Sequence, residues 1–152
     1  MKTTTILFLS LLLSLVTFSQ SDAKKEVKSD RKLFEKEGAN FDWKSFDKAS
    51  NISIDSIKTE IMQGVWKANN GFFKFGDVAN SMSLTQPFIV EIIGNKIRRS
   101  ADSEFEPFTL DKNQITTNNG QDKGCINKIS ESLLIISWQS GTNFTRYYYE
   151  KK

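Results

Sequence analysis

The stretch FIVEIIGNKIRRS, residues 88–100, carries the clearest fold signal in this sequence. Val90 and Ile92 are separated by one residue, so they share one face of an extended strand. The pair Gly94-Asn95 follows, and a second extended run comes directly after it. Gly and Asn tolerate the positive φ angles that a two-residue hairpin turn requires. The stretch therefore predicts two antiparallel strands joined by a tight turn.

Short extended runs separated by turn residues continue on both sides of this hairpin. No segment of helical length and period lies between them, which disfavours a parallel sheet with helical crossovers. The pattern predicts an all-β antiparallel barrel or sandwich of about eight to ten short strands. Besides the hairpin, the expected strands are residues 65–68, 72–75, 82–84, 105–110, 114–117, 125–130, 133–139 and 144–150.

A short helix is expected just before the first strand. Ile57 and Ile61 recur at helical spacing, Ser53 is a good capping residue, and Gly64 ends the run. We therefore place the β-rich domain, including this helix, at residues 54–152.

Residues 1–19 have the features of a secretory signal peptide. Lys2 supplies a positive charge, Ile6 to Phe18 form an apolar run, and small residues precede Gln20. A helix of that length spans about 20 Å, which is short of the ~30 Å hydrocarbon core of a bilayer. We expect cleavage before Gln20 and an exported protein, secreted or periplasmic, without a stable membrane anchor.

Residues 20–53 form a polar N-terminal extension, partly helical or disordered, because few of its residues are apolar enough to repay chain entropy. Phe41, Trp43 and Phe46 are the exception. They can pin the extension onto its own domain or lie in the groove of a protein partner, and we favour the first.

The composition excludes several kinds of chemistry. The chain of 152 residues has no His and a single Cys, so it lacks the imidazole base of catalytic triads and the commonest catalytic zinc ligand. A formal net charge of +3 is too small to indicate nucleic-acid binding. We expect no enzyme activity, no cofactor, no metal and no nucleic acid.

The remaining polar residues are interpreted as structural or solvated. Asp102, Glu104 and Glu106 alternate and fit the solvated face of a strand. Arg98 and Arg99 are adjacent, so on a strand they point to opposite faces and form no patch by adjacency alone. Cys125 fits a half-buried unpaired thiol, since no His is present to activate it.

Several of these segments together resemble a small bacterial lipocalin-like domain. The resemblance rests on Gly64-Val65-Trp66 after the short helix and on the hairpin within residues 90–97, and covers about residues 54–152. Residues 129–136 and 144–149 look like the last two strands of such a domain. The resemblance implies a barrel in which a basic residue of the last strand packs over the Trp. Arg146 is the matching position, so Gly64, Trp66 and Arg146 form the expected signature.

This chain departs from the lipocalin-like pattern in three ways that bear on the size of any cavity. It has no second Cys for a disulfide, its middle strands are expected to be short, and residues 77–87 look irregular.

A barrel interior can be assigned by counting alternate residues from an inward Trp66. These side chains either line a pocket for a small apolar ligand or simply fill the interior. The leading hypothesis is non-catalytic binding of such a ligand, and the alternative is a structural or protein-interaction module of the bacterial cell envelope with a filled core. The candidate pocket residues are Phe73, Phe75, Val90, Ile92, Leu134, Ile136, Trp138 and Tyr148.

Overall fold

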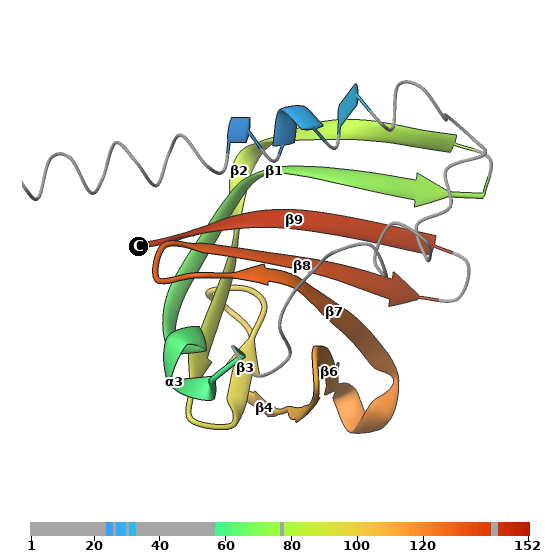
Figure 1. Cartoon of the computed structure of the whole chain (residues 1–152). Coiled ribbons are helices and arrows are strands. Elements are labelled where there is room, and N and C mark those ends of the chain that lie inside the picture. The colour runs from blue at the N-terminus through green and yellow to red at the C-terminus, as the bar shows by residue number, and fades with distance from the viewer. Residues whose placement is uncertain (1–23, 26, 30, 33–56, 77, 141–142) are drawn as a thin grey trace, which may run out of the picture.

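The computed structural model describes residues 24, 25, 27–29, 31, 32, 57–76, 78–140 and 143–152. In these residues nine strands form one antiparallel sheet with the order β4-β3-β2-β1-β9-β8-β7-β6-β5. The sheet curls on itself (Figure 1). Its two edge strands, β4 (Glu106–Pro107) and β5 (Thr109–Asp111), are consecutive in the chain and separated only by Phe108. The predicted antiparallel β-barrel is therefore confirmed, as a nearly closed barrel.

The first two strands are long, where short ones were expected. β1 (Gly64–Phe75) runs through Asn69 and Asn70 without a turn, because a bulge between Ala68 and Asn70 absorbs the irregularity. A Cβ at Gly71 would lie 2.7 Å from the carbonyl oxygen of Arg146, so glycine is what lets β1 approach the last strand here. The prediction of two separate strands in this segment is wrong.

β2 (Val78–Ile93) is one continuous strand, and the irregularity expected before Pro87 is confined to its pairing with β1 between Ser83 and Phe88. Ala68 pairs with Phe88 and Asn70 pairs with Ser83, so the residues between Ser83 and Phe88 bulge out of the ladder while the strand continues. Pro87 lies in that bulge, where its missing N–H leaves no ladder bond unmade. Continuous pairing with β1 on both sides of the bulge keeps the segment extended.

The hairpin at Gly94 has the predicted form. β2 pairs with β3 (Lys96–Arg98) through Ile93 and Lys96, and Gly94 has a φ of +58°. The single strand predicted over residues 105–110 is instead broken at Phe108, whose N–H donates to the carbonyl of Asn95 at 2.9 Å. This break moves the chain from β4 at one sheet edge to β5 at the other.

The rest of the chain is a meander of consecutive antiparallel strands. β6 (Gln114–Thr117) leads through the short helix η3 (Asn118–Gly120) into β7 (Asp122–Ile129). β8 (Leu133–Ser140) and β9 (Asn143–Lys151) follow, and β9 pairs with β1. The first and last long strands therefore lie side by side in the middle of the sheet order.

A short helix closes one end of the barrel. α3 (Thr59–Met62) precedes β1, and the Trp66 indole Nε1 donates to the Met62 carbonyl at 2.7 Å. The Gln63 side chain accepts from the N–H of Gly94 and donates to its carbonyl, which ties α3 to the β2–β3 turn. The expected cap at Ser53 lies outside the described residues.

The described residues of the N-terminal extension, between Lys24 and Lys32, are helical. Phe41, Trp43 and Phe46 lie outside the described residues, as does the signal peptide, and their roles stay predictions. None of the helices in the described part of the chain is long and apolar enough to cross a membrane.

Candidate functional site

Four of the predicted pocket residues are packed inside the barrel. Val90, Ile92, Leu134 and Ile136 are fully buried and belong to one core cluster with Trp66. The inward phase assigned to β2 and β8 is therefore correct. Because these side chains are completely covered, they form a filled core between α3 and the middle of the barrel.

Phe73, Phe75 and Trp138 lie toward the other end of the barrel. Phe73 pairs with Thr145 of β9, and Thr145 pairs with Trp138 of β8, so these side chains project from the same, inner face. The ring of Phe73 stacks on that of Phe75 with centroids 5.2 Å apart. Phe75 is 47% exposed and forms the rim of this end.

A pocket of about 340 Å³ opens here, which we call the barrel-mouth pocket. Its walls combine three aromatic rings with the polar ends of several strands. The lining residues are Phe75, Arg99, Asp122, Trp138, Gln139, Asn143, Phe144 and Thr145.

The predicted position of Tyr148 in the barrel interior is wrong. Tyr148 pairs with Ile135, whereas the inward residues Leu134 and Ile136 pair with Tyr149 and Tyr147. The interior therefore receives Tyr147 and Tyr149 from β9, and Tyr148 lies on the outer face of the sheet.

Arg146 is also on the outer face, so its predicted contact with Trp66 is wrong. It is only 3% exposed and donates from Nε to the Ser137 hydroxyl at 3.1 Å, and Ser137 donates in turn to the Asn127 side chain. Along β1, Arg146 pairs with Phe72, which is well past Trp66.

The basic residue over Trp66 is Lys151. Trp66 pairs with Lys151 across β1 and β9, and the Lys151 ammonium nitrogen lies 5.1 Å from the indole ring centroid. Attraction between an ammonium and an indole face is worth about 0.5–2 kcal/mol, depending on desolvation. Gly64, with a φ of +116°, begins β1 just below this pair. Two of the three expected signature residues therefore lie together, with Lys151 in the place assigned to Arg146.

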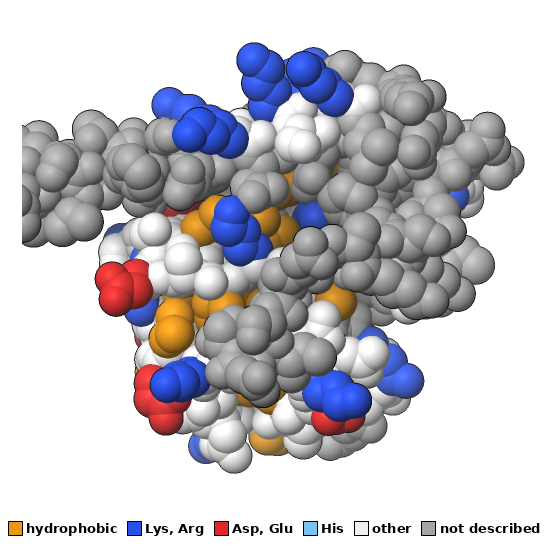
Figure 2. All heavy atoms as spheres, viewed as in Figure 1, with side chains coloured by type: hydrophobic (Ala, Val, Ile, Leu, Met, Phe, Trp, Pro, Cys, Tyr) orange, Lys and Arg blue, Asp and Glu red, His pale blue; other side chains and the backbone are white. Residues whose placement is uncertain are grey.

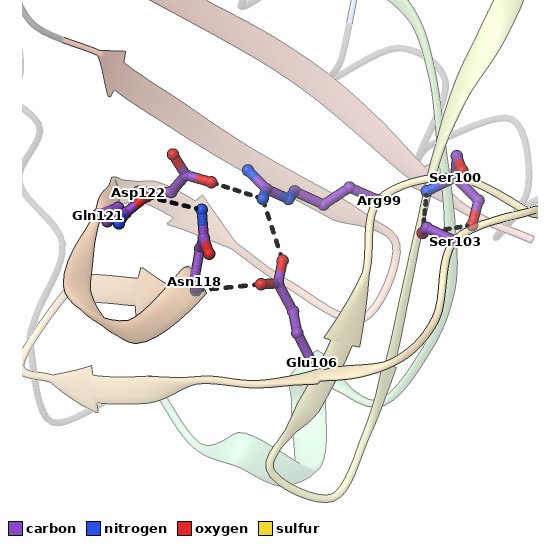
Figure 3. Close-up of polar contacts among 7 residues, drawn as sticks. All are labelled: Arg99, Ser100, Ser103, Glu106, Asn118, Gln121 and Asp122. Atoms are coloured by element: carbon purple, nitrogen blue, oxygen red, sulfur yellow. Dashed lines mark hydrogen bonds and ion pairs between the residues drawn. The ribbon is translucent and has the colours of Figure 1, made fainter.

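A charged cluster spans the seam where the barrel is not closed by strand pairing. Arg99 Nη2 lies 3.0 Å from Glu106 Oε1 and 2.6 Å from Asp122 Oδ2, and Glu106 Oε2 accepts from the N–H of Asn118 at 3.0 Å (Figure 3). These four residues, the Arg99 cluster, connect the end of β3 and β4 with η3 and β7. One positive charge faces two carboxylates, so the cluster keeps an excess of one negative charge.

The Arg99 cluster was missed because its members are far apart in the sequence. Glu106 is not on a solvated strand face as expected, since it contacts Arg99 across the seam. Arg98 and Arg99 do diverge as predicted: Arg98 pairs with Glu91 at 2.5 Å, while Arg99 reaches Asp122. No local pattern around Arg99 indicated that it would pair with Asp122.

Three polar atoms of the described residues are buried in this region without a hydrogen bond of good geometry. They are the Trp138 Nε1, the Tyr149 hydroxyl and the Thr117 hydroxyl. Burial raises the pKa of Tyr149 far above its ordinary value, and a weak hydrogen-bonding interaction with the Trp138 indole and the positive charge of Arg99 partly oppose that rise. Arg99 itself lies over the Trp138 ring, 5.3 Å from its centroid. Trp138 and Tyr149 are thus neighbours, and Arg99 lies above the Trp138 ring.

A larger hollow, about 630 Å³, lies outside the barrel. It separates the helical residues Lys24, Lys28 and Arg31 from Asn70 and Tyr148 on the outer face of β1 and β9. Lys and Arg side chains gather along this margin of the molecule in the space-filling view (Figure 2). Tyr148 thus lines a polar surface hollow, a different place from the predicted pocket.

The other candidate residues for chemistry are unremarkable in their surroundings. Cys125 is half-buried and its Sγ accepts from the Asn113 amide at 3.2 Å, and Asp102 and Glu104 are exposed. The described residues contain no group of carboxylates and thiols arranged to hold a metal ion. Comparison with family models, curated proteins and solved structures found no match for this chain.

Proposed function

We propose that this domain binds a small, largely apolar molecule in the barrel-mouth pocket, without catalysis. The observation that carries the proposal is a pocket of about 340 Å³ between Phe75 and Trp138, at the open end of a barrel whose other end is filled. Ligand pockets in proteins typically measure about 300–1,000 Å³ and combine apolar walls with a few polar groups. The pocket has that composition, at the small end of the range.

The charged residues of the pocket are paired with one another across the seam. Asp122 is held at 2.6 Å by Arg99, and Arg99 is shared with Glu106. Both carboxylates face the same guanidinium across the seam of the barrel. These groups therefore serve to close the seam and shape the pocket.

The proposal includes a lipocalin-like relationship and export. A short helix before a first strand that begins Gly64-Val65-Trp66, and a basic residue of the last strand over that Trp, support the relationship. The signal-peptide pattern of residues 1–19 supports export to the periplasm or the exterior.

The alternative is a structural or protein-interaction module of the cell envelope. It is favoured by the complete burial of Val90, Ile92, Leu134 and Ile136, which leaves only one end of the barrel for a ligand. The two functions predict different effects of a charge introduced at the barrel mouth. Such a charge weakens binding if the ligand occupies the barrel-mouth pocket, whereas an interaction module has no particular sensitivity at that end.

The test is to titrate a neutral, environment-sensitive fluorescent naphthyl ketone into the chain lacking only residues 1–19. Phe75→Glu places a carboxylate at the pocket rim, where it must lose hydration against an apolar ligand. Ile93→Glu is the matched control, since Ile93 is 56% exposed and lies in the hairpin at the α3 end.

We expect saturable binding that Phe75→Glu weakens at least about tenfold, equivalent to about 1.4 kcal/mol, and that Ile93→Glu leaves unchanged. Absence of saturable binding, or equal effects of both substitutions in folded protein, would overturn the proposal in favour of the interaction module.

A further inference from the structure

The barrel interior contains hydrogen-bonding groups that the described part of the chain does not fully satisfy. Among the described residues, Trp138 Nε1 and the hydroxyls of Tyr149 and Thr117 are buried and make no hydrogen bond of good geometry, and the Trp138 indole and the Tyr149 hydroxyl interact only weakly with each other. They come from β8, β9 and β6, and all three side chains belong to inward positions: Thr117 is two residues from the core residue Ile115 on its strand. Native proteins satisfy the great majority of buried polar atoms, and each exception needs an explanation such as a missing ligand or water.

These atoms are next to the barrel-mouth pocket. Trp138 is itself one of the lining residues, and Tyr149 is its neighbour in the interior. Gly124, which pairs with Trp138, leaves the space that the indole occupies, because a Cβ there would lie 2.9 Å from the ring. The indole is therefore held in place by the strand beneath it, and its N–H is a fixed donor.

Resting on the function proposed above, we infer that the ligand is an uncharged apolar molecule with one hydroxyl or carbonyl group, which accepts a hydrogen bond from Trp138 Nε1 and contacts the Tyr149 hydroxyl. Trp Nε1 only donates, so its partner must be an acceptor. The Tyr149 phenol both donates and accepts, so it can complete the bonds of either group.

Entry requires the Arg99 side chain to move. Its guanidinium lies over the Trp138 ring, and the side chain is 31% exposed, so it can swing outward into water. Its ion pairs with Glu106 and Asp122 are partly solvated and therefore weak enough to exchange. The polar group of the ligand then occupies the space beneath the guanidinium.

The charge of the Arg99 cluster disfavours a carboxylate ligand. Arg99 is already paired with Glu106 and Asp122, and a third carboxylate would be repelled by the excess negative charge. An ammonium group would be attracted by that excess, but it has no acceptor to offer to Trp138 Nε1. An alcohol or ketone satisfies the interior donor without adding charge.

The test compares decanol, decanoate and decylammonium, which share an apolar chain and differ in the polar end. Binding to the chain lacking residues 1–19 is measured by calorimetry. We expect decanol to bind at least about tenfold more tightly than either ion. Tyr149→Phe, which removes only the hydroxyl, weakens decanol binding about three- to tenfold, the range of one hydrogen bond. Trp138→Phe, which removes the N–H together with part of the ring, weakens it at least as much. Tyr148→Phe is the control, because that hydroxyl is on the outer face, and it leaves binding unchanged.

The outcomes separate this inference from the proposed function. If decanoate or decylammonium binds as tightly as decanol, the inference is wrong and the proposed binding function stands. If decanol binds most tightly but neither Trp138→Phe nor Tyr149→Phe affects it in folded protein, the inference is also wrong. If none of the three probes nor the naphthyl ketone binds, both are overturned.

Discussion

Replacing Tyr149 by Phe should weaken binding and yet leave the free protein as stable as before, or more stable. The side chain is fully buried, and among the described residues its hydroxyl makes no hydrogen bond of good geometry, only a weak interaction with the Trp138 indole. A buried polar group without a hydrogen bond costs about 1–3 kcal/mol, and the substitution removes that cost while keeping the ring that packs in the core. We expect the free energy of unfolding, measured in urea without ligand, to stay level or rise by about 1 kcal/mol with an unchanged m-value.

The opposite result has a clear meaning. A buried hydroxyl that makes a hydrogen bond in the free protein stabilises it by about 1 kcal/mol, so its removal lowers stability by that amount. A loss of this size in Tyr149→Phe would show that the hydroxyl is already satisfied, which would remove the reason to assign it to a ligand. Tyr147→Phe serves as the comparison, because Tyr147 is only half-buried.

The same substitution has a signature at alkaline pH. Burial raises the pKa of Tyr149, so the phenol keeps its proton in the folded state while an unfolded Tyr loses its proton near pH 10. Above about pH 10 the unfolded state therefore binds fewer protons, and stability falls by about 1.4 kcal/mol per pH unit. Below that pH both states are protonated and the contribution of Tyr149 is constant. Tyr149→Phe should lessen this alkaline loss, and identical pH profiles for the two proteins would contradict the burial of the phenol.

Three further predictions concern the scaffold and export. Trp66→Ala should lower the free energy of unfolding by about 3–5 kcal/mol, as for a large buried aromatic side chain. Lys151→Ala should cost less, and urea melts of the double variant should show a loss smaller than the sum, because the two side chains are in contact; strictly additive losses would refute the contact. Gly71→Ala should destabilise the domain, since its Cβ would lie 2.5 Å from the Met82 Cε and 2.7 Å from the Arg146 carbonyl oxygen; an unchanged melting temperature would show that β1 and β9 can separate there. Intact-mass measurement of exported protein should show a chain that begins at Gln20, and a mass that includes residues 1–19 would contradict the predicted cleavage.

Features with a local physical cause were predictable from the sequence. The turn at Gly94-Asn95 depends on a glycine that adopts a positive φ at Gly94, and the hairpin appears at the expected place. The inward phase of Val90 and Ile92 followed from their alternation with the polar Glu91, and both are in the core. The Trp66 side chain is buried as expected for the first strand of a barrel.

The phase of the last strand was not predictable in the same way. Tyr147, Tyr148 and Tyr149 are identical, so their alternation contains no contrast between an inner and an outer face. The prediction relied on Arg146 pointing inward, but its guanidinium is held by Ser137 on the outer face. The register of β9 against β1, which puts Lys151 opposite Trp66, is a property of two strands far apart in the chain.

Local turn residues were also outweighed by pairing. Asn69 and Asn70 have strong turn preferences, yet β1 stays extended because β2 and β9 both pair with it on either side of the bulge. A preference worth a fraction of a kcal/mol cannot interrupt a strand that is hydrogen-bonded along both edges.

By itself, the sequence determined the secondary-structure class of this protein, the antiparallel hairpins and most of the inward-facing side chains, because these depend on neighbouring residues and on the period of two along a strand. Only the tertiary structure decided which residues form the barrel-mouth pocket. Arg99, Asp122 and Trp138 meet there from three different strands or strand ends. Their meeting depends on how the sheet curls and on the register between strands, and no pattern within a single strand records either of these.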